Sequence, residues 1–416
     1  MLIELAKAKG VEKVEVPDKN IIEILKPNEV EVELTGMAEV ERAINNPIGS
    51  ARLSEIVKPG ESIAIITSDI TRPIPSYKVL PPLLKELKSA GVDMKDVFVV
   101  FALGSHRGHT EEEKKHLVGE EVYNEVRCID CDPKDAVHLG TSKMGTPYDV
   151  FRPVAEADRV ICLGNIEYHY FAGYSGGAKA IMPGVCTRAA IQSNHSRMVE
   201  QTAHAGKLDG NPVREDIDEV AKFRHIDFIV NVVLDAHKEI IKAVAGDYIK
   251  AHREGCRFLD KLYKIEIPKR ADIVLVSPGG FPKDINLYQA QKSLDNSKHA
   301  VREGGIIILC ASCKEGLGEG CFEKWMTTSP SVDFMVEEIE RNFQLGGHKA
   351  AAIAMVMQKS KIFLVSDLDP EFVKSIFFTP FKTVEEAYAA AVKELGEDAS
   401  VIVMPYGGST LPASRN

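Results

Sequence analysis

Two histidines and a lysine stand on either side of a turn of small residues. His169 comes before the turn, Lys179 ends it, and His195 follows in the next segment. Within the turn, Gly176 and Gly177 allow the backbone to adopt positive φ and to approach another molecule closely, because no Cβ is in the way. Imidazoles and an amine on one short scaffold indicate chemistry, most simply a metal site or a covalently held cofactor.

Two other interpretations fit a turn of this kind. A glycine pair near a lysine is commonly only a turn with a solvated charge. A phosphate-binding loop would need glycine before the lysine and Ser or Thr after it, whereas Lys179 stands between Ala178 and Ala180. The nucleoside-triphosphate interpretation is therefore disfavoured.

Titratable side chains also follow three successive apolar segments that have the length of strands. They are Asp69 and Arg72 after 62–67, His106 and Arg107 after 97–102, and His169 and Lys179 after 159–163. Ligands bind at the carboxyl ends of the strands in open α/β sheets, so we expect these side chains to converge. In the alternative interpretation, Asp69 is only a helix N-cap and Arg72 is a neighbouring surface residue. This explains the polar residues after one apolar segment, but it explains less well why three such segments are followed by titratable residues.

Alternation of strand-length apolar segments with helical patterns predicts an α/β fold with mainly parallel, Rossmann-like sheets. The expected strands are 62–67, 97–102, 159–163, 228–234, 273–276, 306–309, 362–365 and 401–404.

Helices are expected over 187–199 and from Thr110 and Thr383 onward. Glu113 and Glu386 stand three residues after these threonines, which is the spacing of a capping box. The helix over 187–199 would carry His195.

A chain of 416 residues is long enough for two domains, each with its own core. The expected boundary lies in 265–270 and gives an N-terminal cofactor-binding domain, 1–267, and a C-terminal α/β domain, 268–396. The tail 397–416 is expected to return to the first domain. Near the amino end, 11–27 is predicted to form a hairpin.

Composition excludes several classes of protein. The formal net charge of −10 argues against nucleic acid as the main partner. No signal peptide is visible, and nowhere do about 18 apolar residues run together, so no membrane span is expected. Eight scattered cysteines fit a reducing compartment, and we expect a cytoplasmic protein. A zinc site that joins the pairs Cys128/Cys131 and Cys310/Cys313 is an alternative. Chance occurrence of the two CxxC spacings is favoured over such a site.

Taken together, the motifs resemble those of the nickel-dependent lactate racemase family. The matching segments are SDITRP at 68–73, GSHR at 104–107, HYFAGYSGGAK at 169–179, SNH at 193–195, YQAQK at 288–292, PGG at 278–280 and EGLG at 315–318. Their order and spacing extend over most of the chain, although each is weak alone apart from 169–179.

The resemblance implies a cofactor, the nickel pincer nucleotide (pyridinium-3-thioamide-5-thiocarboxylate mononucleotide). Lys179 would form the thioamide and so reach the metal through the pincer, and His195 would ligate nickel. Soft sulfur donors suit nickel and leave one coordination position for an imidazole. The residues expected against the cofactor are Asp69, Ile70, Thr71 and Arg72.

The resemblance also implies the reaction, which is the interconversion of the enantiomers of a 2-hydroxy carboxylic acid such as lactate. His106 and His169 would be the two acid/base residues, while Arg72, Gln289 and Lys292 would bind the substrate in a cleft between the domains. The Cα–H of a 2-hydroxy acid is too weakly acidic for histidine to remove, whereas hydride transfer coupled to loss of the hydroxyl proton avoids a carbanion. Expected partners are the small hydroxy acid and cofactor-maturation proteins.

Two alternatives come from other classes of protein. A nicotinamide-dependent 2-hydroxyacid dehydrogenase fits the fold pattern, but no GxGxxG opens a helix after a first strand. A non-catalytic nickel or nucleotide carrier would bind the cofactor without exchanging the α-hydrogen.

Overall fold

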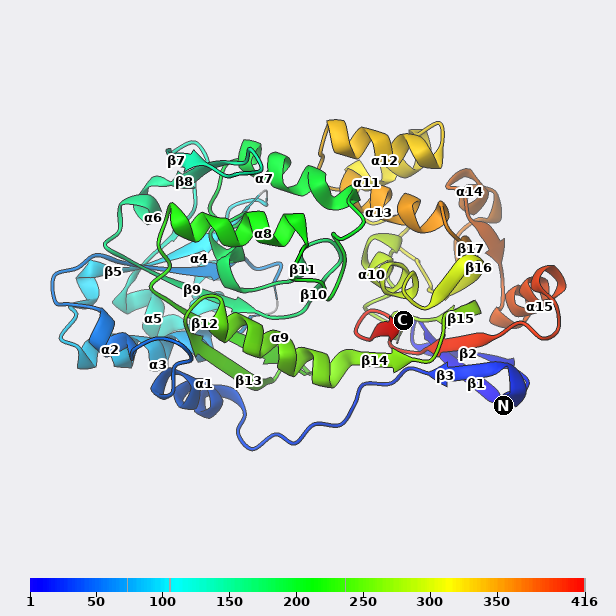
Figure 1. Ribbon diagram of the computed structural model, residues 1–416, viewed down its shortest axis with the longest axis horizontal. Coiled ribbons are helices and arrows are strands. Elements are labelled where there is room, and N and C mark those ends of the chain that lie inside the picture. The colour runs from blue at the N-terminus through cyan, green and yellow to red at the C-terminus, as the bar shows by residue number, and fades with distance from the viewer. Residues whose placement is uncertain (73, 105, 236, 415–416) are drawn as a thin grey trace. The chain divides into compact units, whose positions relative to one another are not determined.

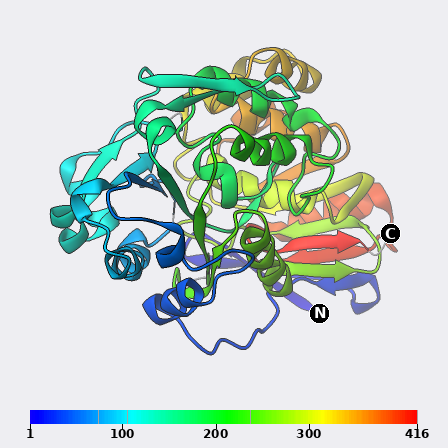
Figure 2. The same cartoon turned by 60° about the vertical axis from the view of Figure 1, so that its left-hand side comes forward.

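The computed structural model describes residues 1–72, 74–104, 106–235 and 237–414 (Figures 1 and 2). Pro73 and Ser105, which belong to two of the motifs above, lie outside the described residues. The chain forms two compact units. We call Val30–Asp260 the inserted unit, and we call Met1–Glu29 together with Lys261–Asn416 the terminal unit.

The inserted unit is built on a six-stranded sheet in the order β13-β12-β9-β4-β5-β6. All neighbouring strands are parallel except β13, which runs antiparallel to β12. The strands are β4 Ile63–Ser68, β5 Val97–Ala102, β6 Arg127–Asp130, β9 Arg159–Asn165, β12 Phe228–Leu234 and β13 Ile240–Gly246.

One face of this sheet packs on helices that precede or connect its first strands. They are α1 Gly36–Asn45, α2 Leu53–Ile56, α3 Ser76–Ser89, α4 Glu111–Val118 and α5 Glu120–Glu125. Their apolar side chains, such as Val40, Leu83 and Val118, form one core with Ile65 and Val99 of the sheet. Burial of these apolar faces is the main force that holds the layers together.

The remaining elements of the inserted unit include those that carry the candidate site. They are β7 Ala136–Thr141, β8 Pro147–Phe151, α6 Arg152–Glu156, β10 Tyr168–His169, β11 Gly173–Tyr174, α7 Arg188–His195, α8 Pro212–Glu219 and α9 Lys250–Tyr263, with short 3-10 turns at Met94–Asp96, Gly177–Ala180, Ser196–Val199 and Val220–Lys222. Gly255 of α9 packs against Val244 and Ile166, which places α9 on the face opposite α1.

The terminal unit contains a second six-stranded sheet, in the order β18-β17-β16-β15-β19-β3, and every pair in it is parallel. Its strands are β3 Ile21–Ile24, β15 Ala271–Val276, β16 Val301–Cys310, β17 Lys361–Val365, β18 Thr379–Phe381 and β19 Val401–Met404. One face is covered by α15 Val384–Leu395 and by a hairpin of β1 Leu2–Lys7 and β2 Gly10–Glu15.

The other elements of the terminal unit are a second strand pair, a set of helices and one 3-10 turn. They are β14 Lys264–Ile267 with β20 Leu411–Ser414, α10 Leu287–Ser297, α11 Gly320–Thr328, α12 Val332–Arg341, α13 Gly347–Met357, α14 Pro370–Ser375 and the turn Asp18–Asn20. Among the described residues of either unit, the helices are too short or too polar to cross a membrane.

The α/β class, the mainly parallel sheets and every expected strand are confirmed. Thr110 and Thr383 are N-caps of α4 and α15, and their hydroxyl oxygens accept from the backbone N–H of Glu113 and Glu386. The predicted helix over 187–199 is α7 followed by a 3-10 turn.

The hairpin predicted over 11–27 is wrong, because β2 pairs with the earlier strand β1. Pro17 fixes its own φ and has no N–H to continue the ladder, and a 3-10 turn follows it directly. This turn sends β3 to the edge of the large sheet, where it pairs with β19.

The division of the chain also differs from the expected domains 1–267 and 268–396. The first 29 residues belong with 261–416, because β3 completes the sheet of that unit. The tail 397–416 does reach early residues through β19 and β3, but both strands lie in the terminal unit, and β20 pairs there with β14.

Candidate active site

Three adjacent parallel strands, β9, β4 and β5, end at the same edge of the sheet in the inserted unit. The chain continues from these ends into the segments that carry Asp69, His106 and His169. The predicted convergence of polar side chains at one sheet edge therefore has its structural basis in the order of these strands.

Asp69 and His106 form a hydrogen-bonded pair across the ends of β4 and β5. The Oδ2 atom of Asp69 lies 2.5 Å from Nδ1 of His106, and the hydroxyl of Thr71 donates to Oδ1 of Asp69 over 2.7 Å. Burial alone would raise the pKa of Asp69, but the bonds from His106 and Thr71 and the charge of Arg72 outweigh it and lower the pKa. The ionised carboxylate holds the Nδ1 proton of His106, so Nε2 is the atom that can exchange protons.

His109 anchors the loop that follows β4. Its side chain is buried, its Nδ1 donates to Oδ1 of Asp130 over 2.6 Å, and its Nε2 accepts the backbone N–H of Ile70 over 3.1 Å. His109 therefore has a structural role. Its link to Ile70 fixes the backbone beside Asp69.

The glycine turn takes the predicted positive φ, with Gly176 at 78° and Gly177 at 63°. A Cβ on Gly176 would meet the side chains of Asn231 and Ile166, and one on Gly177 would meet the ring of His252. The backbone N–H of Gly177 donates to Oδ1 of Asn231 over 2.8 Å. The close approach that these glycines permit is therefore to the protein's own side chains.

A fully buried arginine, Arg214 of α8, holds the backbone ahead of the turn. Its Nε donates to the carbonyl oxygen of Ala172 over 3.2 Å, and another guanidinium nitrogen donates to that of Tyr174. The next carbonyl, that of Ser175, accepts from Nε2 of His252 over 2.8 Å. Arg214 and His252 cannot be selected from the sequence, because a buried arginine or histidine looks the same there as an exposed one.

Lys179 lies close to two guanidinium groups in a half-buried position. Burial lowers the pKa of its amine well below the usual value, and the charges of Arg214 and Arg72 lower it further. A neutral amine is the nucleophilic form of lysine, so this environment suits covalent attachment of a cofactor.

His169 is also held in its neutral form. Burial lowers its pKa well below the usual value, and the charge of Arg72 adds to the effect. Its Nδ1 accepts the backbone N–H of Ala172 over 3.2 Å, which places the proton of the neutral ring on Nε2.

His195 ends α7 and is buried, with 8% of its surface exposed. The ring of Phe171 lies between the two imidazoles of this region, 4.5 Å from the centroid of His169 and 4.9 Å from that of His195. The Nδ1 atom of His195 is 2.8 Å from Oδ1 of Asn194. Both imidazoles therefore pack against the same aromatic ring, that of Phe171.

Arg72 connects the two groups of residues. Its charge lowers the pKa of Asp69 on one side and those of His169 and Lys179 on the other, although its side chain is exposed. The structure thus brings together the predicted site residues of the inserted unit, which are Asp69, Thr71, Arg72, His106, His169, Lys179 and His195.

The three remaining predicted residues are one of the inserted unit and two of the terminal unit. Arg107 is 67% exposed and pairs with Glu113 of α4, so nothing places it with the cluster. Gln289 and Lys292 lie on α10 of the terminal unit, the first exposed and the second partly exposed. The backbone of Ile70 belongs to the cluster through His109, while its side chain is 39% exposed.

The donor set fits a nickel pincer cofactor. No group of three or more His, Cys, Asp or Glu side chains that could hold a metal ion occurs in the part of the chain that the structure describes. A neutral lysine and an imidazole within one cluster are the two protein groups that such a cofactor requires.

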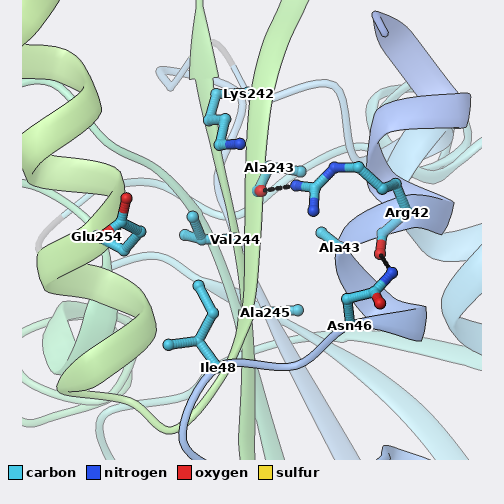
Figure 3. Close-up of a pocket in the computed structure, with 9 residues that line it drawn as sticks. All are labelled: Arg42, Ala43, Asn46, Ile48, Lys242, Ala243, Val244, Ala245 and Glu254. Carbon is cyan, nitrogen blue, oxygen red and sulfur yellow. Dashed lines mark hydrogen bonds between the residues drawn. The ribbon is translucent and has the colours of Figure 1, made fainter. Parts of the chain in front are cut away.

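A pocket of about 330 Å³ lies elsewhere in the inserted unit, between α1, β13 and α9 (Figure 3). Arg42 at its wall forms a bidentate pair with buried Glu39 and donates to the carbonyl oxygen of Ala243 over 2.9 Å. Lys242 is 3.7 Å from the same carboxylate. Because both cations share Glu39, this pocket is a poor place for a substrate carboxylate, and it contains none of the predicted site residues.

Known proteins are similar to this chain over nearly its whole length. Residues 8–206 match the family model of the lactate racemase N-terminal domain, and residues 267–411 match that of the lactate racemase C-terminal domain. Lactate racemase from Thermoanaerobacterium thermosaccharolyticum is 34% identical over 421 residues, which is 98% of each chain. Lactate racemase from Lactiplantibacillus plantarum is 34% identical over 384 residues, which is 90% of each chain.

Solved structures agree with these matches. The lactate racemase apoprotein from Thermoanaerobacterium thermosaccharolyticum superposes with a TM-score of 0.89 at 34% identity, covering 99% of this chain and all of that one (100%). A crystal structure of a Thermotoga maritima protein superposes with a TM-score of 0.64 at 18% identity over 92% of this chain, and it shows the fold alone.

Proposed function

The chain belongs to the lactate racemase family and is an isomerase, and from this premise we propose that it interconverts the enantiomers of lactate or a related 2-hydroxy carboxylic acid. The observation that carries the proposal is the cluster in which Arg72 lies near Asp69, His169 and Lys179. It combines a carboxylate-binding cation, imidazoles for proton transfer and a neutral amine.

Two imidazoles would move the hydroxyl proton. Asp69 fixes the Nδ1 proton of His106, which leaves the lone pair of the neutral ring on Nε2. The N–H of Ala172 occupies Nδ1 of His169, which leaves the proton on Nε2. His106 can therefore accept the hydroxyl proton at Nε2, and the N–H at Nε2 of His169 can donate a hydrogen bond to the substrate oxygen.

Substrate binding needs a planar cation for the carboxylate. The guanidinium of Arg72 can form two parallel hydrogen bonds to a carboxylate, which orients the substrate as well as attracting it. Gln289 and Lys292 of α10 stay predictions as further substrate-binding residues.

The family implies a nickel-dependent enzyme, and we propose the nickel pincer nucleotide as the cofactor. When bound, this group accepts and returns the hydride that leaves Cα of the substrate. Lys179 would hold it covalently, His195 would hold its metal, and the loop from Asp69 to Arg72 would lie against it. Cofactor-maturation proteins are the partners that such an attachment calls for.

The substrate is tested with the cofactor-loaded enzyme and a panel of single-enantiomer 2-hydroxy acids. Loss of optical purity without net oxidation is expected for at least one acid, with lactate examined first. Production of a 2-keto acid that depends on added nicotinamide would instead show a dehydrogenase. Loaded enzyme that racemises none of the acids would overturn the proposal.

Attachment of the cofactor is tested by intact-protein mass spectrometry under denaturing conditions. The loaded wild type is expected to carry an adduct that Lys179→Ala lacks. An adduct that persists in Lys179→Ala would place the attachment on another residue.

A further inference from the structure

A chain of buried polar side chains begins at His195 and leads away from the candidate site into the core of the inserted unit. Nδ1 of His195 is 2.8 Å from Oδ1 of Asn194, and Nδ2 of Asn194 donates to Oδ2 of Asp216 over 2.7 Å. The hydroxyl of Thr146 donates to the same Oδ2 over 2.7 Å. Asn194, Asp216 and Thr146 are completely buried, at 0% exposure.

The orientation of the Asn194 amide follows from its partners. Its Nδ2 also contacts the carbonyl oxygen of Val213 over 3.1 Å, so both amide hydrogens point at acceptors. A flipped amide would set its oxygen against a carbonyl and a carboxylate, which repel it, and would remove the amide N–H from both of these acceptors. The amide oxygen is therefore the atom that faces His195.

The orientation of the amide determines the tautomer of the imidazole. An amide oxygen can only accept, so Nδ1 of His195 must carry the proton and the lone pair of the neutral ring must lie on Nε2. Phe171 packs edge to face against the ring at 4.9 Å and limits its rotation. Nδ1 of His195 thus donates its proton to the buried amide of Asn194, and Nε2 carries the lone pair that a metal ion can accept.

We propose that Asn194 and Asp216 are positioning residues that fix His195 as an Nε2 donor for the metal of the cofactor. The assignment of the tautomer comes from the contacts of this unit alone, whereas the purpose, metal binding, rests on the proposed function. Partners of this kind orient metal-bound histidines and raise their basicity, and their loss typically weakens metal binding by about 10–100-fold.

The tautomer is tested in the apoprotein by nitrogen NMR of ¹⁵N-histidine-labelled protein, with the His195 signals assigned from their loss in His195→Gln. Wild type is expected to show a protonated Nδ1 and an unprotonated Nε2. In Asn194→Leu, which removes the acceptor at similar volume, the ring is expected to lose this preference. An Nε2–H form in wild type, or an unchanged tautomer in Asn194→Leu, would overturn the proposal.

Two internal controls separate positioning from loss of structure. His109 and His252 donate from opposite nitrogens, Nδ1 to Asp130 and Nε2 to Ser175, and their signals are expected to stay unchanged in the variants. Should Asn194→Leu not fold, Asp216→Asn removes the charge but keeps an oxygen for Asn194, and a smaller shift in the same direction is expected. No shift in a folded Asp216→Asn would remove Asp216 from the proposal.

Nickel content of the loaded protein after dialysis against a chelator gives the second readout. Asn194→Leu is expected to retain nickel about 10–100-fold less tightly than wild type. The matched control is Asn20→Leu, because Asn20 is a buried amide of the terminal unit whose Nδ2 also contacts two carbonyl oxygens. Wild-type retention is expected for that control.

The tautomer and the nickel content together show whether the ligand role of His195 or the positioning role of Asn194 fails. Retention of nickel by His195→Gln would contradict the ligand role in the proposed function, whatever the tautomer. Wild-type retention by Asn194→Leu, together with loss of nickel from His195→Gln, would keep the ligand and overturn the positioning role.

Discussion

The carboxylate of Asp69 lies 2.5 Å from the Nδ1 nitrogen of His106, and the two side chains differ sharply in exposure, at 3% and 30%. A buried acid thus holds a half-exposed base. The same carboxylate accepts the hydroxyl of Thr71 and senses the charge of Arg72. Its ionisation therefore links the stability of the fold to the preparation of His106 for proton transfer.

This link predicts a pH dependence of stability. The pKa of Asp69 is lowered in the folded protein, so the unfolded chain takes up the proton at the higher pH. The stabilisation is complete above the ordinary aspartate pKa of about 3.9 and is lost as the pH falls through the lower folded-state value. Asp69→Asn is expected to lower the free energy of unfolding by about 1.5–3 kcal/mol at pH 5, and by progressively less below about pH 4.

Urea unfolding of both proteins across this range checks the prediction, with exposed Asp209→Asn as the control that changes little. A difference between wild type and Asp69→Asn that stays constant or grows on acidification would contradict it.

The histidine pair is expected to act from two sides of the substrate. Racemisation in either direction needs one base and one acid, so His106→Ala and His169→Ala should each slow both directions by about 10²–10⁴-fold. The half-reaction should differ, because each variant keeps the imidazole that serves one enantiomer. Single-turnover absorbance changes after mixing with each pure enantiomer are expected to show opposite preferences.

His116→Ala on α4 is the control for this pair, since His116 is exposed and lies outside the cluster. Identical responses of the two variants to both enantiomers would rule out the two-sided arrangement. Wild-type racemisation in both would make the pair structural.

Gly173 faces His169 in the short hairpin of β10 and β11, and it has a φ of 76°. A Cβ here would overlap the backbone oxygen of Lys207, whereas Gly210, with a φ of 71°, has nothing within 4 Å of its Cβ position. Gly210→Ala should therefore cost about 1–2 kcal/mol from the left-handed backbone alone. Gly173→Ala should cost about 1–3 kcal/mol more from overpacking.

Chemical denaturation of the two glycine variants gives the comparison directly. Equal losses of stability would mean that the hairpin moves away from Lys207 without cost.

Arg214 is expected to be the most costly arginine to remove. Arg214→Met would remove the guanidinium donors from the buried carbonyl oxygens of Ala172 and Tyr174, although that of Ala172 keeps the N–H of Tyr174, so the expected cost is about 1–3 kcal/mol. Arg257→Met is the matched control, because Arg257 is 64% exposed and pairs along its own helix with Glu254, a contact worth about 0.5 kcal/mol or less.

The free energy of unfolding in urea distinguishes the two arginine variants. An Arg214→Met protein as stable as Arg257→Met would show that water replaces the guanidinium.

The sequence was informative where chemistry follows a simple rule of position. Asp69, His106 and His169 were predicted because each follows an apolar strand, and parallel strands deliver such residues to one edge whatever the details of packing. The same rule included Arg107, whose pairing with Glu113 depends on the course of the loop before α4.

What could not be predicted depends on contacts between distant residues. Arg214 lies next to Val213 in an ordinary amphipathic helix, and only the path of the glycine turn makes it a buried donor. The pairing of β3 with β19 joins residues near opposite ends of the chain, so no local sequence pattern predicts this pairing. Asn194 belongs to the motif SNH at 193–195, but its role depends on Asp216, which comes from another helix.

The entry and exit of the inserted unit lie side by side. Asn28, just before that unit, donates from its backbone to the carbonyl oxygen of Leu262 over 2.8 Å and from its side chain to that of Lys261 over 2.9 Å. An insertion whose two ends meet can be excised and the gap closed by a short loop without straining the host. Met1–Glu29 joined to Lys261–Asn416 is thus a natural candidate for a minimal protein, and the uninterrupted stretch Val30–Asp260 can complete its own sheet during synthesis before its host acquires β19.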